Sequence, residues 1–574
     1  MNPETFFENF DLLCEAPNGI EKLRELILQL AVMGKLVPQD PNDEPASVLL
    51  EKIKAEKQRC IISKEIQADK KLSPIIKETP PWIIPPSWEW IRFQEIFEIT
   101  RGGSPRPAGD PQYFGGDIPW ITVKEITKDS EKYLTITTDF LTELGSKRSR
   151  YIYPLDLLLT NSGATLGVPK ISKIKGCIND GVARLNCFHD LISKDYAYYY
   201  LSQQTRAFRE VNQGMGQPNL NTSILAGWFL PLPPLAEQKC IVTKVDELMV
   251  LCDKLEARRR KKQEIKSKLN SAALERMLKA ENQEEFGQHW QRICENFDLL
   301  YDNPENVEKL RQAILQLAVQ GKLVEQNPED EPASVLIEKI GTKKRQMVKE
   351  GKIKKVSPLK QVSECEFPFD LPKNWIWIRL GDGLLKLTDG THHSPTNEST
   401  GDFKYITAKN IKTDGIDLTN ITYVTSKIHE EIYSRCDPEY GDILYIKDGA
   451  TTGVTVINDL EEQFSMLSSV ALMKLPSEIE NKYLLYMLRS PYFYSLMREG
   501  MSGVAITRVT LTKLNNALVP LPPLNEQKRI VEIVEQFMGL CDELESKLRK
   551  EREDSEKLME TVVRGLLEGV VAEI

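Results

Sequence analysis

The residues best suited to chemistry lie on glycine-rich loops. One loop reads Asn161-Ser162-Gly163-Ala164-Thr165-Leu166-Gly167, and a similar one reads Lys447-Asp448-Gly449-Ala450-Thr451-Thr452-Gly453. Their amide, hydroxyl and cationic side chains can donate or accept hydrogen bonds. The first loop lacks the Gly-Lys-Ser/Thr ending of a phosphate-binding P-loop, so it does not predict ATP binding by that mechanism. The loops therefore predict binding by hydrogen bonds rather than nucleotide chemistry.

The usual signatures of an enzyme do not stand out from this sequence. No Gly-x-Gly-x-x-Gly follows a predicted strand, so no dinucleotide-type cofactor loop is predicted. Adenine methylation uses a tetrapeptide such as Asn-Pro-Pro-Tyr, in which a polar residue and an aromatic ring hold a flipped base. Thr79-Pro80-Pro81-Trp82 has the wrong first residue and reads better as a rigid linker into a strand. We expect no catalytic residues in this chain.

The number and spacing of cysteines and histidines indicate whether disulfides or metal sites are expected. The chain has 10 cysteines and 5 histidines, with no Cys-x-x-Cys pair. This scatter predicts reduced thiols, a cytoplasmic location and no metal site. Cys252 and Cys541 lie in apolar helical contexts, where a small buried hydrophobic residue is the expected role.

Charge does not mark the chain as a nucleic-acid protein. The formal net charge is −9 over 574 residues, whereas a protein that coats nucleic acid unaided is basic. Residues 80–235 are near neutral at +1, and residues 367–523 carry −4. If the chain binds DNA, its cations must cluster in three dimensions or a partner must supply much of the phosphate neutralisation.

The elements that carry these loops belong to an internal repeat. Residues 8–53 recur at 295–340 with 33 of 46 positions identical, and 231–256 recur at 520–545. Each copy of the second segment begins Pro-Leu-Pro-Pro-Leu-x-Glu-Gln-Lys. The chain is thus a tandem duplication of a unit of roughly 287 residues, which keeps its ends and varies its middle.

Local patterns predict the elements of each copy. Residues 18–33 have helical periodicity, with Asn18 and Glu21 spaced as a capping box and Gly34 as the stop. A second helix should begin near Pro45. The middles read as short strands and turns, with helices at 195–211 and 481–498. The fold class is therefore α+β.

A long helix follows each proline-rich segment. Residues 237–280 and 526–569 each read as one helix, with apolar residues at spacings of four and three, as in the seam of a coiled coil. We expect the two helices to pair as an antiparallel coiled coil. The predicted parts are helix pairs at 1–60 and 290–348, β-rich domains at 80–235 and 367–523, and long helices at 236–280 and 524–571.

This arrangement resembles the specificity subunits of type I restriction-modification systems over nearly the whole chain. The resemblance implies that each variable middle is a target recognition domain reading one half of a bipartite site in double-stranded DNA. It also implies that the helical frame docks two modification subunits, which hold S-adenosylmethionine and methylate adenine N6. Motor-nuclease restriction subunits, with ATP and Mg²⁺, would complete the complex, and no cofactor is expected in this chain.

The resemblance directs attention to side chains able to reach base edges, because phosphate contacts position a protein without reading sequence. The candidates in the first domain are Arg101, Ser104, Arg106, Lys124, Asn161, Ser162, Thr165, Gln217 and Asn219. Those in the second domain are Thr388, Thr391, His392, His393, Lys409, Lys447, Thr451, Thr452 and Arg508. For any one of them, a role as an ordinary solvated turn residue is an equally good reading.

A second function class fits the acidic balance. The chain could be a non-enzymatic protein–protein scaffold whose variable domains do not read DNA. No stretch approaches the roughly 18 apolar residues of a membrane span, and the N-terminus has no secretory pattern. Membrane partners are therefore not expected.

Overall fold

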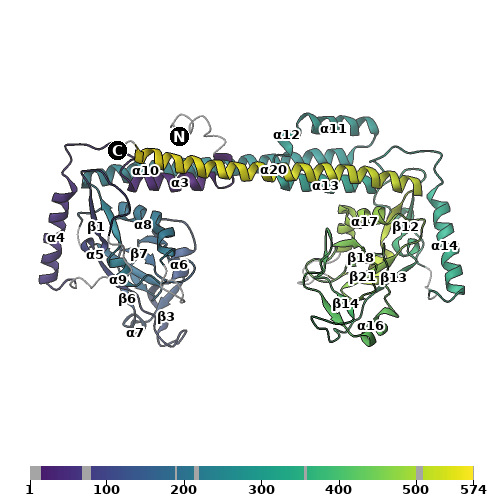
Figure 1. The fold of residues 1–574 in the computed structure, drawn as a ribbon, viewed down its shortest axis with the longest axis horizontal. Helices are drawn as coiled ribbons and strands as arrows, with labels where there is room; N and C mark the ends of the chain where they lie inside the picture. The colour runs from purple at the N-terminus through teal and green to yellow at the C-terminus, as the bar shows by residue number, and fades with distance from the viewer. Residues whose placement is uncertain are drawn as a thin grey trace. The chain divides into compact units, whose positions relative to one another are not determined.

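A computed structural model describes residues 14–66, 79–187, 190–211, 219–353, 359–499 and 508–572. The chain divides into two compact units, each containing helices and small sheets (Figure 1). Unit 1 comprises Met1–Lys261 and Arg552–Ile574, and unit 2 comprises Lys262–Glu551. Within each unit the sheets lie on one side of the main helices, as expected for the α+β class.

Unit 1 begins with the predicted helix pair, α3 (Gly19–Val32) and α4 (Ala46–Ile62). Gly34 has a φ of +72°, and a Cβ there would lie 2.4 Å from the Pro85 ring, so glycine is required for both reasons. The predicted capping box is wrong, because Asn18 makes no side-chain cap and its backbone is not extended. The Asn18 amide instead reaches Glu556 near the end of the chain.

The described residues of the β-rich part of unit 1 form three sheets. Their strand orders are β1-β11, β2-β10-β7-β8-β4 and β5-β3-β9-β6. The strands are β1 (Glu89–Arg92), β2 (Phe97–Arg101), β3 (Phe114–Ile121), β4 (Tyr133–Leu134), β5 (Asp139–Leu141), β6 (Arg150–Ile152), β7 (Leu157–Thr160), β8 (Pro169–Ser172), β9 (Gly176–Ile178), β10 (Val182–Cys187) and β11 (Phe229–Leu232). The helices are α5 (Phe93–Ile96), α6 (Val123–Thr127), α7 (Glu143–Ser146), α8 (Lys194–Arg209) and α9 (Thr222–Ala226). The helix predicted at 195–211 is thus confirmed as α8.

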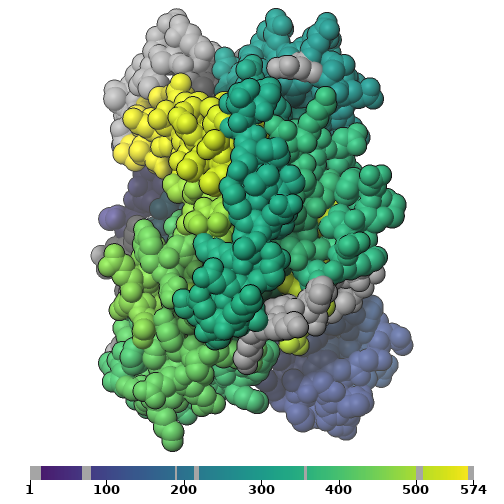
Figure 2. All heavy atoms as spheres, turned by 90° about the vertical axis from the view of Figure 1, so that its right-hand side faces the viewer, coloured from purple at the N-terminus to yellow at the C-terminus, as the bar shows by residue number. Residues whose placement is uncertain are grey.

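Unit 2 repeats this plan with different sheets, ordered β12-β22, β13-β21-β18-β19, β17-β14-β20 and β15-β16. The strands are β12 (Ile376–Arg379), β13 (Lys386–Asp389), β14 (Phe403–Ile406), β15 (Ile411–Lys412), β16 (Gly415–Ile416), β17 (Thr422–Val424), β18 (Ile443–Ile446), β19 (Thr455–Ile457), β20 (Ser465–Met466), β21 (Val470–Lys474) and β22 (Leu518–Leu521). The helices are α11 (Gln283–Glu295), α12 (Phe297–Leu300), α13 (Pro304–Val319), α14 (Ala333–Lys349), η1 (Glu364–Glu366), α15 (Leu380–Gly383), α16 (Ser426–Tyr433), α17 (Asn481–Arg489), α18 (Pro491–Arg498) and α19 (Leu511–Asn516). Figure 2 shows the face of unit 2 on which α14 lies at the surface.

One predicted helix of unit 2 is broken in two. The expected helix at 481–498 ends at Arg489, and α18 begins at Pro491 with Ser490 as its N-cap. Ser490 is extended, with a ψ of 153°, because the residue before a proline is pushed out of the helical region. The helical periodicity of the sequence continued across this break and hid it.

The two long helices are each unbroken, as predicted. Helix α10 (Leu235–Lys279) has 45 residues and passes from unit 1 to unit 2 at Lys261. Helix α20 (Leu524–Ala572) has 49 residues and returns to unit 1 at Arg552. Within unit 2, Lys309 and Lys322 of the α13 region bond to residues 267–271 and 278–280, so α13 runs parallel to α10.

Helix α20 runs the other way within the same unit. Arg311 bonds to Glu545, whereas Gln326, further along the chain, bonds to Glu526. Helices α10 and α20 are therefore antiparallel there, in agreement with the predicted fold class.

The seams of the long helices face their own repeat. Ile241, Val245 and Cys252 join a core formed with α3 and α8, and Ile530, Val534 and Cys541 join one formed with α13. The burial of Cys252 and Cys541 agrees with the role predicted for them. Periodicity thus identified the buried faces but could not identify which helix covers each of them. No helix in the described ranges is long and apolar enough to cross a membrane.

Candidate nucleic-acid interface

Each β-rich segment is fixed to its helices by the repeated Pro-Leu-Pro-Pro-Leu-x-Glu-Gln motif. The Gln238 side chain is fully buried; its Oε1 accepts from the Ser193 N–H at 2.8 Å and its Nε2 donates to the Pro233 carbonyl at 3.0 Å. Gln527 makes the equivalent bonds with the Glu480 N–H and the Pro522 carbonyl, at 2.8 and 2.9 Å. The motif is therefore structural: it ties the start of α8 or α17 to the start of a long helix.

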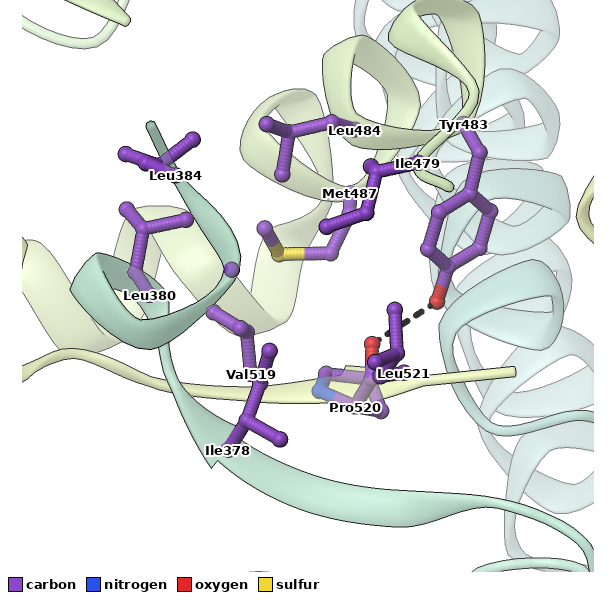
Figure 3. Close-up of a pocket in the computed structure, with 11 residues that line it drawn as sticks. Ile378, Leu380, Leu384, Ile479, Tyr483, Leu484, Met487, Val519, Pro520 and Leu521 are labelled. Carbon is purple, nitrogen blue, oxygen red and sulfur yellow. Dashed lines mark hydrogen bonds between the residues drawn. The ribbon is translucent and has the colours of Figure 1, made fainter. Parts of the chain in front are cut away.

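A buried tyrosine completes this attachment in each unit. The Tyr196 hydroxyl donates to the Pro231 carbonyl at 2.8 Å, and the Tyr483 hydroxyl donates to the Pro520 carbonyl at 3.0 Å (Figure 3). Burial raises the pKa of both phenols well above the ordinary value, so they remain neutral donors. The small cavity beside Tyr483 is lined mainly by aliphatic side chains and offers no polar site.

The glutamate of the motif links the helix pair to the same point. Glu237 accepts from Trp88 Nε1 at 2.9 Å and from Gln39 Nε2 at 2.5 Å, and Glu526 accepts from Gln326 at 2.6 Å. Burial raises the pKa of both glutamates, while these hydrogen bonds act in the opposite direction. The repeated ends of the two units thus form equivalent scaffolds.

Three candidates of unit 1 meet on this scaffold. Ser162 and Asn219 form an isolated antiparallel bridge, and the Leu220 N–H donates to the Asn161 carbonyl at 2.8 Å. The Asn161 N–H in turn donates to the Gly181 carbonyl at 2.9 Å. Asn161 is 1% exposed, and its side-chain Oδ1 has no hydrogen-bond partner among the described residues. It lies beneath the loop surface rather than on it.

Arg101 and Ser104 converge on the same loop through Asp180. Arg101 Nε donates to the Asp180 carbonyl at 2.7 Å, and the Ser104 hydroxyl donates to its carboxylate. Arg101 is exposed and ends β2, so its guanidinium is accessible from solvent. The structure therefore gathers five of the nine candidates of unit 1 around residues 180–181.

The other candidates of unit 1 are more dispersed. Lys124 is exposed on α6 and follows Val123, which packs on Gly181. Arg106 is exposed, and its carbonyl accepts from Arg148. Thr165 is half-buried, with its carbonyl bonded to the Thr160 hydroxyl. Gln217 lies outside the described residues.

Unit 2 repeats the bridge with different side chains. Asp448 and Arg508 are bridged as Ser162 and Asn219 are, and the Val509 N–H donates to the Lys447 carbonyl at 2.8 Å. The Lys447 side chain is 3% exposed, and its Nζ lies 3.1 Å from Asp448 and 3.4 Å from Asp389. Lys447 thus occupies the place of Asn161, again beneath the surface.

Asp389 ends β13 where Arg101 ends β2. Arg101 pairs with Ala183 and Asp389 pairs with Ala471, the second residue of β10 and of β21 respectively. The Asp389 side chain is 2% exposed, and its Oδ1 lies 2.6 Å from Arg435 Nη2 and 3.3 Å from His392 Nε2. A cationic position of the first unit is therefore an anionic one in the second.

The remaining candidates of unit 2 are loop residues with local bonds. Thr388 is buried in β13, and the Thr452 hydroxyl donates to the Gly449 carbonyl at 2.7 Å. The Thr391 hydroxyl donates to the carbonyl of exposed His393 at 3.1 Å. Thr451 and Lys409 are exposed. The Lys409 N–H donates to the Thr407 hydroxyl at 3.3 Å.

The sequence predicted neither the aspartates that hold the candidate side chains nor one arginine that contacts them. These residues are Asp180 in unit 1, and Asp389, Asp448 and Arg435 in unit 2. Sequence reasoning favoured donors, because DNA presents phosphates and base acceptors, and so it passed over carboxylates that hold those donors. Asp389 directly precedes the Gly390-Thr391 loop, which was a usable signal. Arg435 had none, because only the fold brings it to Asp389.

These sites offer hydrogen-bond donors and acceptors on paired scaffolds. Among the residues that the structure describes, no group of three or more His, Cys, Asp or Glu side chains could hold a metal ion. The two units thus carry polar surfaces that differ in charge on equivalent scaffolds.

Comparisons with known proteins place this arrangement in a family. The family model of the type I restriction modification DNA specificity domain matches twice, over residues 85–267 and 372–553. The EcoEI specificity subunit of Escherichia coli is 32% identical over 562 residues, covering 92% of this chain and 91% of that protein. The EcoAI specificity subunit of Escherichia coli is also 32% identical, over 551 residues, covering 92% of this chain and 90% of that protein.

A solved structure is also similar. The HsdS subunit from Thermoanaerobacter tengcongensis has a TM-score of 0.38 at 18% identity, over 84% of this chain and 97% of that one. On the family and sequence matches, this chain belongs to the specificity subunits of type I restriction-modification systems. It is a specificity subunit and not a catalytic one.

Proposed function

We propose that the chain selects a bipartite DNA sequence, with residues 80–235 reading one half and residues 367–523 reading the other. The observation that carries this proposal is the pair of equivalent bridges, Ser162–Asn219 and Asp448–Arg508, on equivalent scaffolds. The same backbone arrangement presents different side chains in each unit, as two readers of different sequences require.

The exposed candidates are the proposed contacts, and the buried ones support them. Arg101, near the first bridge, and Arg508, a member of the second, are exposed cations and can reach bases or phosphates. Asn161, Lys447, Thr388 and Thr452 are buried, so we assign them to holding the loops. The acidic residues nearby lower the net charge of each cluster, which fits reading by hydrogen bonds better than coating of phosphates.

The helical frame is the proposed dock for two modification subunits. The frame comprises the helix pairs at 1–60 and 290–348 and the long helices at 236–280 and 524–571. Support comes from the duplicated attachments of Gln238 and Gln527, since equivalent scaffolds offer the same docking surface twice. S-adenosylmethionine would be bound by the modification subunits, and ATP and Mg²⁺ by restriction subunits, which would join the same complex.

Co-expression of the chain with the genes that neighbour its own tests the proposal. We expect a complex with two modification subunits in native mass spectrometry, and adenine methylation at a bipartite motif when the host genome is sequenced. A complex that forms but modifies no defined motif would favour the scaffold reading, for which the acidic balance is the supporting observation. A one-to-one complex at saturating partner would contradict the stoichiometry.

A further inference from the structure

The side chain that unit 2 presents most distinctively is Arg435, just beyond the end of α16. Its side chain is 52% exposed, yet its Nη2 is held 2.6 Å from Asp389 Oδ1 and 3.0 Å from His392 Nε2. Both contacts are made by Nη2, and among the described residues Nε and Nη1 have no hydrogen-bond partner. Arg435 therefore presents a planar guanidinium to solvent, and only its Nη2 is held by the protein.

Asp389, the carboxylate that holds the Arg435 guanidinium, is buried. Asp389 is 2% exposed, and its second oxygen lies 3.4 Å from the buried Lys447 ammonium. A buried carboxylate needs cationic or hydrogen-bonding partners, and Lys447 supplies one from below. Lys447 is enclosed together with Asp389, at 3% side-chain exposure, whereas the Arg435 side chain is 52% exposed. The arrangement fits an arginine held in position to bind something outside the chain.

The charges of the side chains around Arg435 indicate which class of ligand it binds. The cluster contains Arg435, Lys447 and Arg508 against Asp389 and Asp448, three cations and two anions, joined in sequence by contacts of 2.6 to 3.4 Å. This near balance weakens attraction to a bare phosphate. A planar fork of fixed orientation instead matches the O6 and N7 acceptors of guanine in the major groove, the commonest specific contact of arginine.

From this geometry we infer that Arg435 reads a guanine in the half-site recognised by unit 2, with Asp389 as its positioning residue. The inference rests on the proposed DNA-reading function. Unit 1 has Arg101 in place of Asp389, so the same device is not available to it. The half-site read by unit 2 therefore contains a G·C pair whose recognition depends on this arginine, and the half-site read by unit 1 does not depend on it.

The test compares methylation motifs of complexes assembled with the modification subunits and variants of the full chain. The variants are Arg435→Gln, Arg435→Lys and Asp389→Asn; Lys427→Ala, an exposed cation on the preceding helix α16, is the matched control. Arg435→Lys keeps the charge and can still pair with Asp389, so it guards against loss of folding. Because a lysine ammonium donates to guanine from one flexible point rather than from a planar guanidinium, we expect Arg435→Gln to lose discrimination at one G·C pair by roughly ten- to a hundred-fold and Arg435→Lys to lose part of it.

Asp389→Asn should relax the same base pair and no other, a result that general destabilisation would not give. Lys427→Ala should keep the wild-type motif. The inference is overturned if Arg435→Gln keeps the motif and rate, or if it slows methylation at all sites equally and Arg435→Lys restores it, which marks a phosphate contact. A wild-type complex that methylates no bipartite site would instead refute the proposed function itself.

Discussion

The attachment made by Gln238 can be tested quantitatively, because Gln527 provides a built-in duplicate. Replacing Gln238 by Ala removes the fully buried side chain that accepts from the Ser193 N–H and donates to the Pro233 carbonyl. Losing these two bonds and leaving their partners unsatisfied should cost about 2 to 4 kcal/mol. Helix α8 begins directly after Ser193, so the cost should appear first as easier local opening of this helix.

Hydrogen–deuterium exchange with mass spectrometry measures that opening. In Gln238→Ala, amides of 194–209 should exchange roughly 30- to 700-fold faster, the equivalent of that free energy. Gln527→Ala should instead accelerate α17 (481–489) and leave α8 unchanged, while Lys239→Ala, an exposed neighbour, should alter neither. If α8 exchanges at the same rate in Gln238→Ala and Lys239→Ala, the motif is not the attachment described.

Three further predictions follow from burial, charge and helix length. Burial raises the pKa of Glu237 and Glu526 in the folded protein above the pKa in the unfolded chain. Their contribution to the free energy of unfolding is therefore present below the unfolded-state pKa and is lost as the pH rises through the folded-state pKa. The unfolding free energy measured in urea should therefore fall less steeply above about pH 4.3 in the Glu237→Gln/Glu526→Gln double variant, and equal slopes would contradict this. Maleimide labelling followed by mass spectrometry should show that the exposed thiols react first: Cys240, Cys294 and Cys365. Cys436 should react last, because it is buried and its pKa is raised to about 12. Labelling of Cys436 as fast as that of Cys365 would be inconsistent with this burial. Four residues inserted after Leu255 and after Leu544 lengthen each long helix by about 6 Å, so the unread gap in the DNA site should grow by one or two base pairs at about 3.4 Å each. An active insertion variant with an unchanged gap in methylome sequencing would show that these helices do not set the spacing.

The division into two similar units and two long helices could be predicted because the same sequence segments occur twice. Two copies of Pro-Leu-Pro-Pro-Leu-x-Glu-Gln and two unbroken apolar seams predict two scaffolds and two long helices without any knowledge of contacts. The structure adds the reason for the motif: Gln238 bonds to Ser193, 45 residues away in sequence, and Glu237 bonds to Trp88, 149 residues away. Local patterns cannot reveal such partners.

The candidate site was predictable only in part, for the same reason. Glycine-rich loops predicted where polar side chains gather, and Asn161, Ser162 and Asn219 do meet. Burial separated Asn161 and Lys447 from the exposed candidates, and strand pairing placed Asp389 beside Lys447 and Arg435. Depth and long-range register are properties of the folded sheet, and residue type alone does not contain them.

The central claim, that each β-rich domain reads its own half of a bipartite site, is tested most directly by exchanging one domain. Residues 80–235 would be replaced by the corresponding segment of a family member with a known motif, with the scaffold residues Gln39, Glu237 and Gln238 kept. Genome-wide methylation mapping of the co-expressed complex should show one half of the motif replaced by that of the donor and the other half unchanged. A motif in which both halves change, or neither does, would contradict the account.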